Sequence, residues 1–95
     1  MAKVSKFDSA EYLNDPEDIA IYLAEAFETG DASFITHALG TVARAKGMAK
    51  IAEKVGVGRE SLYKSLTKDA NPAFETVVKV LDSIGLKMTV TVKVA

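Results

Sequence analysis

Apolar residues recur every three or four positions along most of the chain, a period typical of helices that bury one side. The first two helices are expected from about residue 16 to 28 and from Asp31 to near Gly47. Residues suited to helix boundaries stand where these helices begin and end, namely Asn14, Asp15, Pro16, Gly30, Asp31 and Gly47. The positions expected to face inward are Ile19, Leu23, Ala26 and Phe27, then Phe34, Ile35, Ala38, Leu39, Val42 and Ala45.

The middle of the chain predicts two short helices joined by a tight turn. The stretch MAKIAEKV (48–55) has helical spacing, and Gly56 supplies the left-handed backbone that a sharp turn requires. The next helix then runs to Leu66 within GVGRESLYKSL (56–66). The side chains expected to pack inward are Ile51, Ala52, Val55, Val57, Leu62 and Leu66. Those left facing outward on the fourth helix are Arg59, Glu60, Ser61, Tyr63 and Lys64.

The period changes in the last third of the chain. A fifth helix is expected from Pro72, capped by Asn71, to Gly85. Its apolar stripe is expected to be Phe74, Val77, Val78, Leu81 and Ile84. Over residues 86–94 apolar and polar residues alternate, which is typical of a half-buried strand.

This single strand needs a partner for its backbone hydrogen bonds, and no second strand is predicted in the chain. Pairing with its own copy across a two-fold axis satisfies them, and a frayed terminus is the alternative. The sequence therefore predicts a homodimer whose dimerisation residues are Leu86, Met88, Val90 and Val92.

Charge is divided unevenly along the chain, although the net charge is only −1. Residues 1–31 hold two lysines against eight acidic residues, whereas residues 44–68 hold seven basic residues against two acidic ones. Such asymmetry suggests separate partners for the acidic N-terminal helix region (1–30) and the basic block, the alternative being solvated helix faces.

With 95 residues and no Ser- or Pro-rich linker, the chain is expected to form one domain (1–95) with a small core. The absence of cysteine excludes disulfides and thiolate metal sites, and it fits a cytoplasmic location. Neither a signal peptide nor an apolar run of membrane-spanning length is found, so no membrane partner is expected.

The remaining polar residues do not predict catalytic or cofactor chemistry. His37 is the only histidine, so a metal site lacks ligands. Ser61 and Ser65 have no neighbouring base, and the carboxylates of residues 15–18 complement the dipole at the start of a helix. GVGRES lacks the third glycine and the preceding strand of a dinucleotide-binding fingerprint. The chain is therefore expected to be no enzyme and to need no metal or other cofactor.

Two helices joined by a short turn at a glycine are typical of a helix-turn-helix, predicted here over residues 48–66. The second helix of such a motif lies in the major groove of double-stranded DNA, where Arg or Lys contacts guanine edges. Lys46, Lys50 and Lys54 suit contacts to phosphates, and the exposed amides beside Gly58 favour a phosphate as well. The alternative is an αα-hairpin in a small helical bundle.

The residues resemble those of a known family over nearly the whole chain. MAKIAEKVGVGRESLYKSL is similar to the helix-turn-helix of the Cro-type (XRE) repressors. FDSAEYLNDPEDIAIYLAEAF, ALGTVARAKGM and NPAFETVVKVLDSIGLKMTV together are similar to the antitoxins of addiction modules, the antidote protein family. The resemblance implies an all-α, five-helix, lambda-repressor-like domain with one C-terminal β-strand that pairs across a homodimer. It also implies a type II antitoxin that neutralises a RelE/ParE-like toxin and represses its own operon by binding the operator.

Position by position, the resemblance assigns DNA contact to four residues of the fourth helix and a phosphate contact to Lys50. The predicted DNA-binding set is Lys50, Gly58, Arg59, Glu60, Ser61, Tyr63 and Lys64. The chain departs from the family at Gly58, where a serine usually caps the recognition helix, and glycine there costs about a few tenths of a kcal/mol. A protein-interaction module with this fold and little or no DNA binding is therefore the alternative function.

The acidic region acquires a role if the toxin is basic, because opposite charges speed and orient association. Tyr12, Leu13 and Tyr22 lie near this charge and are candidates for the buried anchors of a toxin interface. The alternative is that these side chains only cover the small core.

Overall fold

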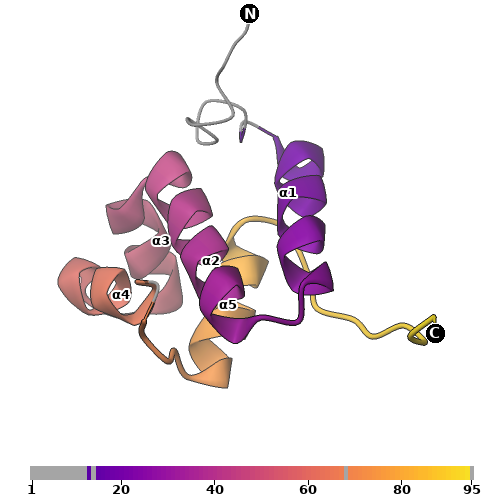
Figure 1. The fold of residues 1–95 in the computed structure, drawn as a ribbon. Coiled ribbons are helices and arrows are strands. Elements are labelled where there is room, and N and C mark those ends of the chain that lie inside the picture. Colours follow the sequence, from indigo (N-terminus) through magenta and orange to yellow (C-terminus); the bar gives the residue numbers. More distant parts are fainter. Residues whose placement is uncertain (1–12, 14, 68, 95) are drawn as a thin grey trace, which may run out of the picture.

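The computed structural model describes residues 13, 15–67 and 69–94, and five helices form within them (Figure 1). They are α1 (Pro16–Glu28), α2 (Ala32–Lys46), α3 (Met48–Val55), α4 (Arg59–Ser65) and α5 (Phe74–Ser83). Helix α3 packs against α2, α4 and α5, whereas α1 packs against α2. The prediction of an all-α fold with five helices is confirmed. None of the helices in these residues is long and apolar enough to cross a membrane.

Side-chain caps fix the first turns of the two long helices. The Asp15 carboxylate accepts a hydrogen bond of 2.8 Å from the amide of Asp18 at the start of α1. The Asp31 carboxylate accepts one of 3.0 Å from the amide of Ser33 at the start of α2. These bonds satisfy backbone donors that have no partner inside the helix. Both predicted aspartate caps are confirmed, and Asn14 lies outside the described residues.

The buried side chains come from all five helices and from Leu13, which precedes α1. They form one apolar cluster: Leu13, Ile19, Leu23, Ala26, Ala38, Leu39, Val42, Ala43, Met48, Ile51, Ala52, Val55, Leu62, Leu66, Val80, Leu81 and Ile84. Tyr22 and Leu86 are partly buried against this cluster. Leu13 and Tyr22 therefore cover the core, and Tyr12 lies outside the described residues.

Helix α5 differs from its prediction in both start and orientation. It begins at Phe74 with Ala73 as its N-cap, so the predicted start at Pro72 with an Asn71 cap was wrong. Phe74 is 71% exposed, whereas Val80 is fully buried. Two overlapping apolar stripes exist on this helix, and packing against α3 selects the stripe of Val77, Val80, Leu81 and Ile84 while leaving Phe74 and Val78 exposed.

The C-terminal segment, residues 86–94, leaves the end of α5 and runs past α1 (Figure 1). No strand is formed there, because the described part of the chain offers no second strand to pair with. Val90, Val92 and Val94 are each 90% exposed or more. The predicted C-terminal strand is thus not formed by the chain alone, and its pairing in a dimer stays a prediction.

A close approach between α2 and the end of α4 depends on Gly40. A Cβ atom at this position would overlap the backbone carbonyl oxygen of Leu66, which is the C-cap residue of α4. Because the overlapping atom belongs to the backbone rather than to a flexible side chain, a Cβ atom could be accommodated only if the two helices moved apart. Gly40 is therefore required for α4 to lie where it does.

Replacing Gly40 with alanine is expected to lower the free energy of unfolding by about 1–3 kcal/mol, because the added methyl overpacks a closed contact. Urea unfolding at fixed protein concentration measures this change. Gly58→Ala is the matched control, since Gly58 has open space around its Cβ position and a φ of −71°. The free energy of unfolding of this control variant should change by no more than about 0.5 kcal/mol. Equal midpoints for the two variants would contradict the close-approach account.

Candidate nucleic-acid interface

The turn between α3 and α4 is built by backbone hydrogen bonds and one left-handed residue. Gly56 has φ 89° and ψ 29°, a conformation that residues with a Cβ adopt at a cost. The amides of Gly56 and Val57 both donate to the carbonyl of Ala52, at 2.8 and 3.1 Å. These bonds end α3 and redirect the chain within residues 56–58.

Helix α4 begins without a side-chain cap. Gly58, its N-cap residue, is extended, with φ −71° and ψ 151°, and its carbonyl accepts the amide of Leu62 at 3.0 Å. Glycine has no side chain that could accept from the first amides of the helix, and no side-chain cap bond is formed at this N-cap residue. The prediction that Gly58 leaves this helix end uncapped is confirmed.

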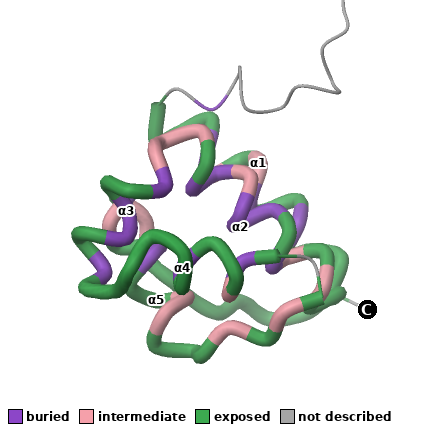
Figure 2. The backbone as a smooth tube through the Cα atoms, turned by 90° about the vertical axis from the view of Figure 1, so that its left-hand side faces the viewer, coloured by how far each residue is buried: buried purple, intermediate pink, exposed green. Residues whose placement is uncertain are grey.

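The two sides of α4 are sharply separated. Leu62 and Leu66, four residues apart, are each 1% exposed and anchor the inner side in the core. Ser65 turns its hydroxyl back to the carbonyl of Leu62 at 2.9 Å. The outer side consists of the predicted residues Arg59, Glu60, Ser61, Tyr63 and Lys64, all of them exposed. In Figure 2, α4 faces the viewer and is coloured mostly as exposed.

A hollow of about 300 Å³ lies beside this outer side. Arg59, Glu60 and Tyr63 of α4 line it together with Met48 of α3 and Arg44 of α2. Two guanidinium groups, a phenol ring and a carboxylate are thereby brought to one concave surface. This composition suits polar recognition of a charged partner.

Arg44 is the residue of this surface that reasoning from the sequence missed. Its charge belongs to the basic block of residues 44–68, but no contact was predicted for it. The structure places it in the same hollow as Arg59, and its Nη2 donates to Thr41 Oγ1 at 3.3 Å. That bond orients the guanidinium along the exposed side of α2.

The lysines of α3 are distributed differently from the prediction. Lys50 is exposed near the start of the helix, as its predicted role requires. Lys54 instead extends to the carbonyl of Ser83 at the end of α5, with Nζ 3.5 Å from the oxygen. Lys54 is therefore directed toward α5 rather than toward the hollow, and Lys68 lies outside the described residues.

These features define a small all-helical domain that turns a polar, partly basic short helix toward solvent. Comparison with known proteins identifies the family of this domain. A family model described as "Probable addiction module antidote protein" matches residues 3–92, and the chain therefore belongs to this family.

The chain is also 41% identical over 88 residues to an uncharacterized protein of Haemophilus influenzae. That match covers 93% of this chain and 91% of the relative. No solved structure matches the chain significantly. An antidote counteracts a toxin, so the family supports an antitoxin role and a toxin partner in general, and it implies a regulatory protein rather than an enzyme.

The separation of the two sides of α4 predicts opposite consequences for neighbouring substitutions. Leu62→Ala should lower the free energy of unfolding by about 2–5 kcal/mol, because it opens a cavity in the core. Lys64→Ala should change it by less than about 0.5 kcal/mol, because the side chain is exposed. Chemical denaturation of both variants measures the difference. A large loss for Lys64→Ala would show that the outer side has a structural partner.

Proposed function

We propose that α3, residues 56–58 and α4 form a helix-turn-helix whose outer side enters the major groove of the protein's own operator. The antitoxin would then repress its operon while silencing its toxin. One observation carries this proposal: burial of Leu62 and Leu66 leaves Arg59, Ser61 and Lys64 exposed together on α4. Groove entry requires a helix whose polar side is unobstructed over consecutive turns.

Charge supports DNA as the partner of this surface. The basic block of residues 44–68 carries seven cationic side chains against two acidic ones, in a chain whose net charge is −1. Arg44, which lines the hollow beside α4, and the exposed Lys50 of α3 are proposed to contact phosphates, which fix the position of the protein on the duplex. Arg59 is proposed to read a guanine, for which its two parallel donors are suited.

A homodimer through residues 86–94 is proposed to bind two half-sites. The segment carries its apolar residues at every second position and exposes them. Helix α4 and this segment lie on opposite sides of the chain (Figure 1), so dimerisation leaves α4 accessible. The two half-sites are expected to lie one or more complete DNA turns apart, and each turn is about 34 Å long. The proposed location, where operator DNA is found, is the cytoplasm.

The toxin is proposed to be a basic protein of the RelE/ParE-like fold that binds the outer side of α1. Glu17, Ile21, Glu25 and Glu28 follow one another at helical spacing and are all exposed. Ile21 is 63% exposed between carboxylates, so it offers an apolar anchor inside an acidic surface. Leu13 is unavailable for this role because it is buried in the core.

A protein-interaction module with little or no DNA binding is the second candidate. The uncapped start of α4 at Gly58 favours it, because a less rigid recognition helix holds its side chains less well for base contacts. This candidate retains the toxin-binding side of α1 and gives no role to the hollow beside α4.

Binding to a duplex from its own promoter should weaken steeply as salt rises, because phosphate contacts release counterions. Arg59→Ala should weaken binding by roughly 5- to 150-fold, the equivalent of about 1–3 kcal/mol, when measured by fluorescence anisotropy. Lys79→Ala removes the same charge from α5, where Lys79 pairs with Glu75 at 3.0 Å, and should leave affinity nearly unchanged. Equal losses for both variants would show that Arg59 makes no specific groove contact, and a response independent of salt would favour the second candidate.

Ile21→Gln should weaken binding of the proposed RelE/ParE-like toxin by about tenfold, because the apolar anchor is lost. Isothermal titration calorimetry with the purified pair measures the effect. Phe74→Gln is a suitable control, since Phe74 is similarly exposed on α5. If only the control variant loses affinity, the toxin contacts a different surface.

A further inference from the structure

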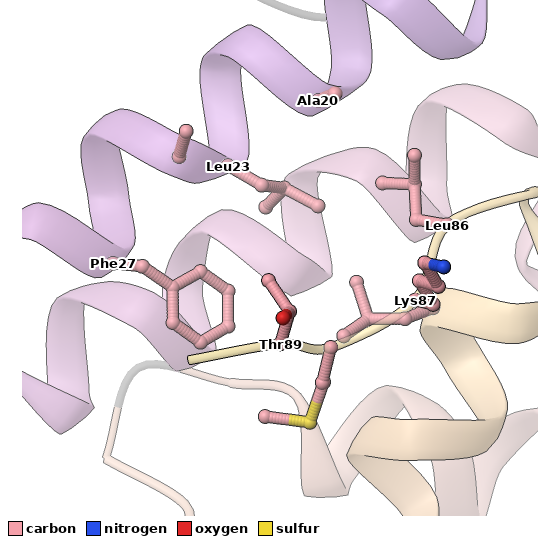
Figure 3. Close-up of a pocket in the computed structure, with 9 residues that line it drawn as sticks. Ala20, Leu23, Phe27, Leu86, Lys87 and Thr89 are labelled. Atoms are coloured by element: carbon pink, nitrogen blue, oxygen red, sulfur yellow. The ribbon is translucent and has the colours of Figure 1, made fainter. Parts of the chain in front are cut away.

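An apolar groove of about 280 Å³ lies between α1 and the start of the C-terminal segment (Figure 3). Leu23 and Phe27 line it from α1, and Leu86 and Thr89 line it from the segment. The small side chains of Ala20 and Ala24 form part of its wall, Leu81 and Met88 add apolar lining, and Lys87 lines it as well. Helix α1 and the C-terminal segment, which form the groove, lie on the opposite side of the chain from α4 (Figure 1), so the groove takes no part in the proposed DNA contact.

The dimensions of helices and strands explain why this groove is open. A helix is about 10 Å wide with its side chains, and neighbouring strands lie about 4.8 Å apart, so one helix covers two strands. Among the described residues, 86–94 are the one extended segment that runs past α1. The space that a second strand would fill is left as the groove.

Pairing geometry identifies what a second strand would bring there. In an antiparallel pair related by a two-fold axis, paired residue numbers have a constant sum. An even sum places all apolar residues of residues 86–94 on one face, whereas an odd sum mixes them with Thr and Lys on both faces. Burial of an apolar face therefore selects an even sum.

The three most central registers with an even sum all deliver a valine to the groove. Pairs centred on Thr89, Val90 and Thr91 set the partner's Val90, Val92 and Val94, respectively, opposite Met88. Directly opposite residues have Cβ atoms about 4.5–5.5 Å apart. Because Met88 lines the groove, the valine opposite it reaches the groove as well.

We infer that the groove between α1 and residues 86–89 is the docking site for the C-terminal valines of a second copy of this chain. The inference rests on the strand pairing proposed above and adds its receiving surface, the side of α1 that carries Ala20, Ala24 and Phe27. By symmetry each copy fills the groove of the other. The valines that are 90% exposed or more in the single chain become covered, and α1 becomes part of the dimer.

The acidic side of α1 stays accessible in this arrangement. Ile21 lies on that side, is 63% exposed and does not line the groove. Exposure alone would make Ile21 the expected dimer contact. The inference instead assigns the dimer contact to Ala24, three residues away on the same helix.

The experiment measures the dimer dissociation constant of the full chain by sedimentation equilibrium, for Ala24→Gln, Ile21→Gln and Val92→Gln. All three changes keep the net charge, and Ala24 is exposed in the single chain, so its variant keeps the fold. Ala24→Gln and Val92→Gln should each raise the dissociation constant by roughly tenfold or more, because a long amide enters an apolar contact. Ile21→Gln should leave it unchanged.

The outcomes separate the inference from the proposals on which it rests. If Val92→Gln weakens the dimer and Ala24→Gln does not, strands pair but the groove is not the docking site, and the inference is wrong. If the chain is monomeric at every concentration, both strand pairing and the inference are wrong. Such a result would not decide whether the chain binds its promoter or a toxin, because the anisotropy and calorimetry titrations measure those affinities separately. A loss with Ile21→Gln equal to that with Ala24→Gln would place the second copy on the acidic side and would also overturn the inference.

Discussion

The close approach of Gly40 to the carbonyl of Leu66 is the constraint on which the arrangement of the chain depends. It brings the end of α4 against the backbone of α2 and leaves no room for adjustment. Leu62 and Leu66 then enter the core, and this fixes the rotation of α4 about its axis. The exposure of its polar residues follows from that rotation, so the candidate site is a consequence of core packing rather than of the site residues themselves.

The fold also separates the surfaces to which roles are proposed. Helix α4 and the hollow lined by Arg44 and Arg59 lie on one side, and α1 with residues 86–94 lies on the other (Figure 1). Within α1, the exposed acidic stripe around Ile21 is distinct from the groove formed with Ala24. The DNA, toxin and dimer contacts proposed for this chain therefore do not compete for one surface.

Local chemistry made much of the fold predictable from the sequence. Asp15 and Asp31 cap helices through their own carboxylates. Leu62 and Leu66 are apolar and four residues apart, so their burial on one side of α4 follows from the helical period. Other features depend on groups distant in the chain. The apolar pattern around Phe74 fits two stripes, and contact with α3 decides which of them is buried. Arg44 and Arg59 line one hollow because α2 and α4 pack closely, which the absence of a Cβ atom at Gly40 permits. The strand predicted over residues 86–94 is not formed in the single chain, and its pairing with a second chain stays a prediction.

The central claim is that the outer side of α4 contacts DNA, and amide chemical shifts test it most directly. The measurement is a ¹H–¹⁵N spectrum of the full chain titrated with a duplex from its own promoter at moderate salt. The account predicts that the largest shifts occur at residues 58–64, with smaller ones at Arg44 and Lys50, while α1 and α5 are little affected. Shifts concentrated in α1 or α5, with α4 unchanged, would contradict it.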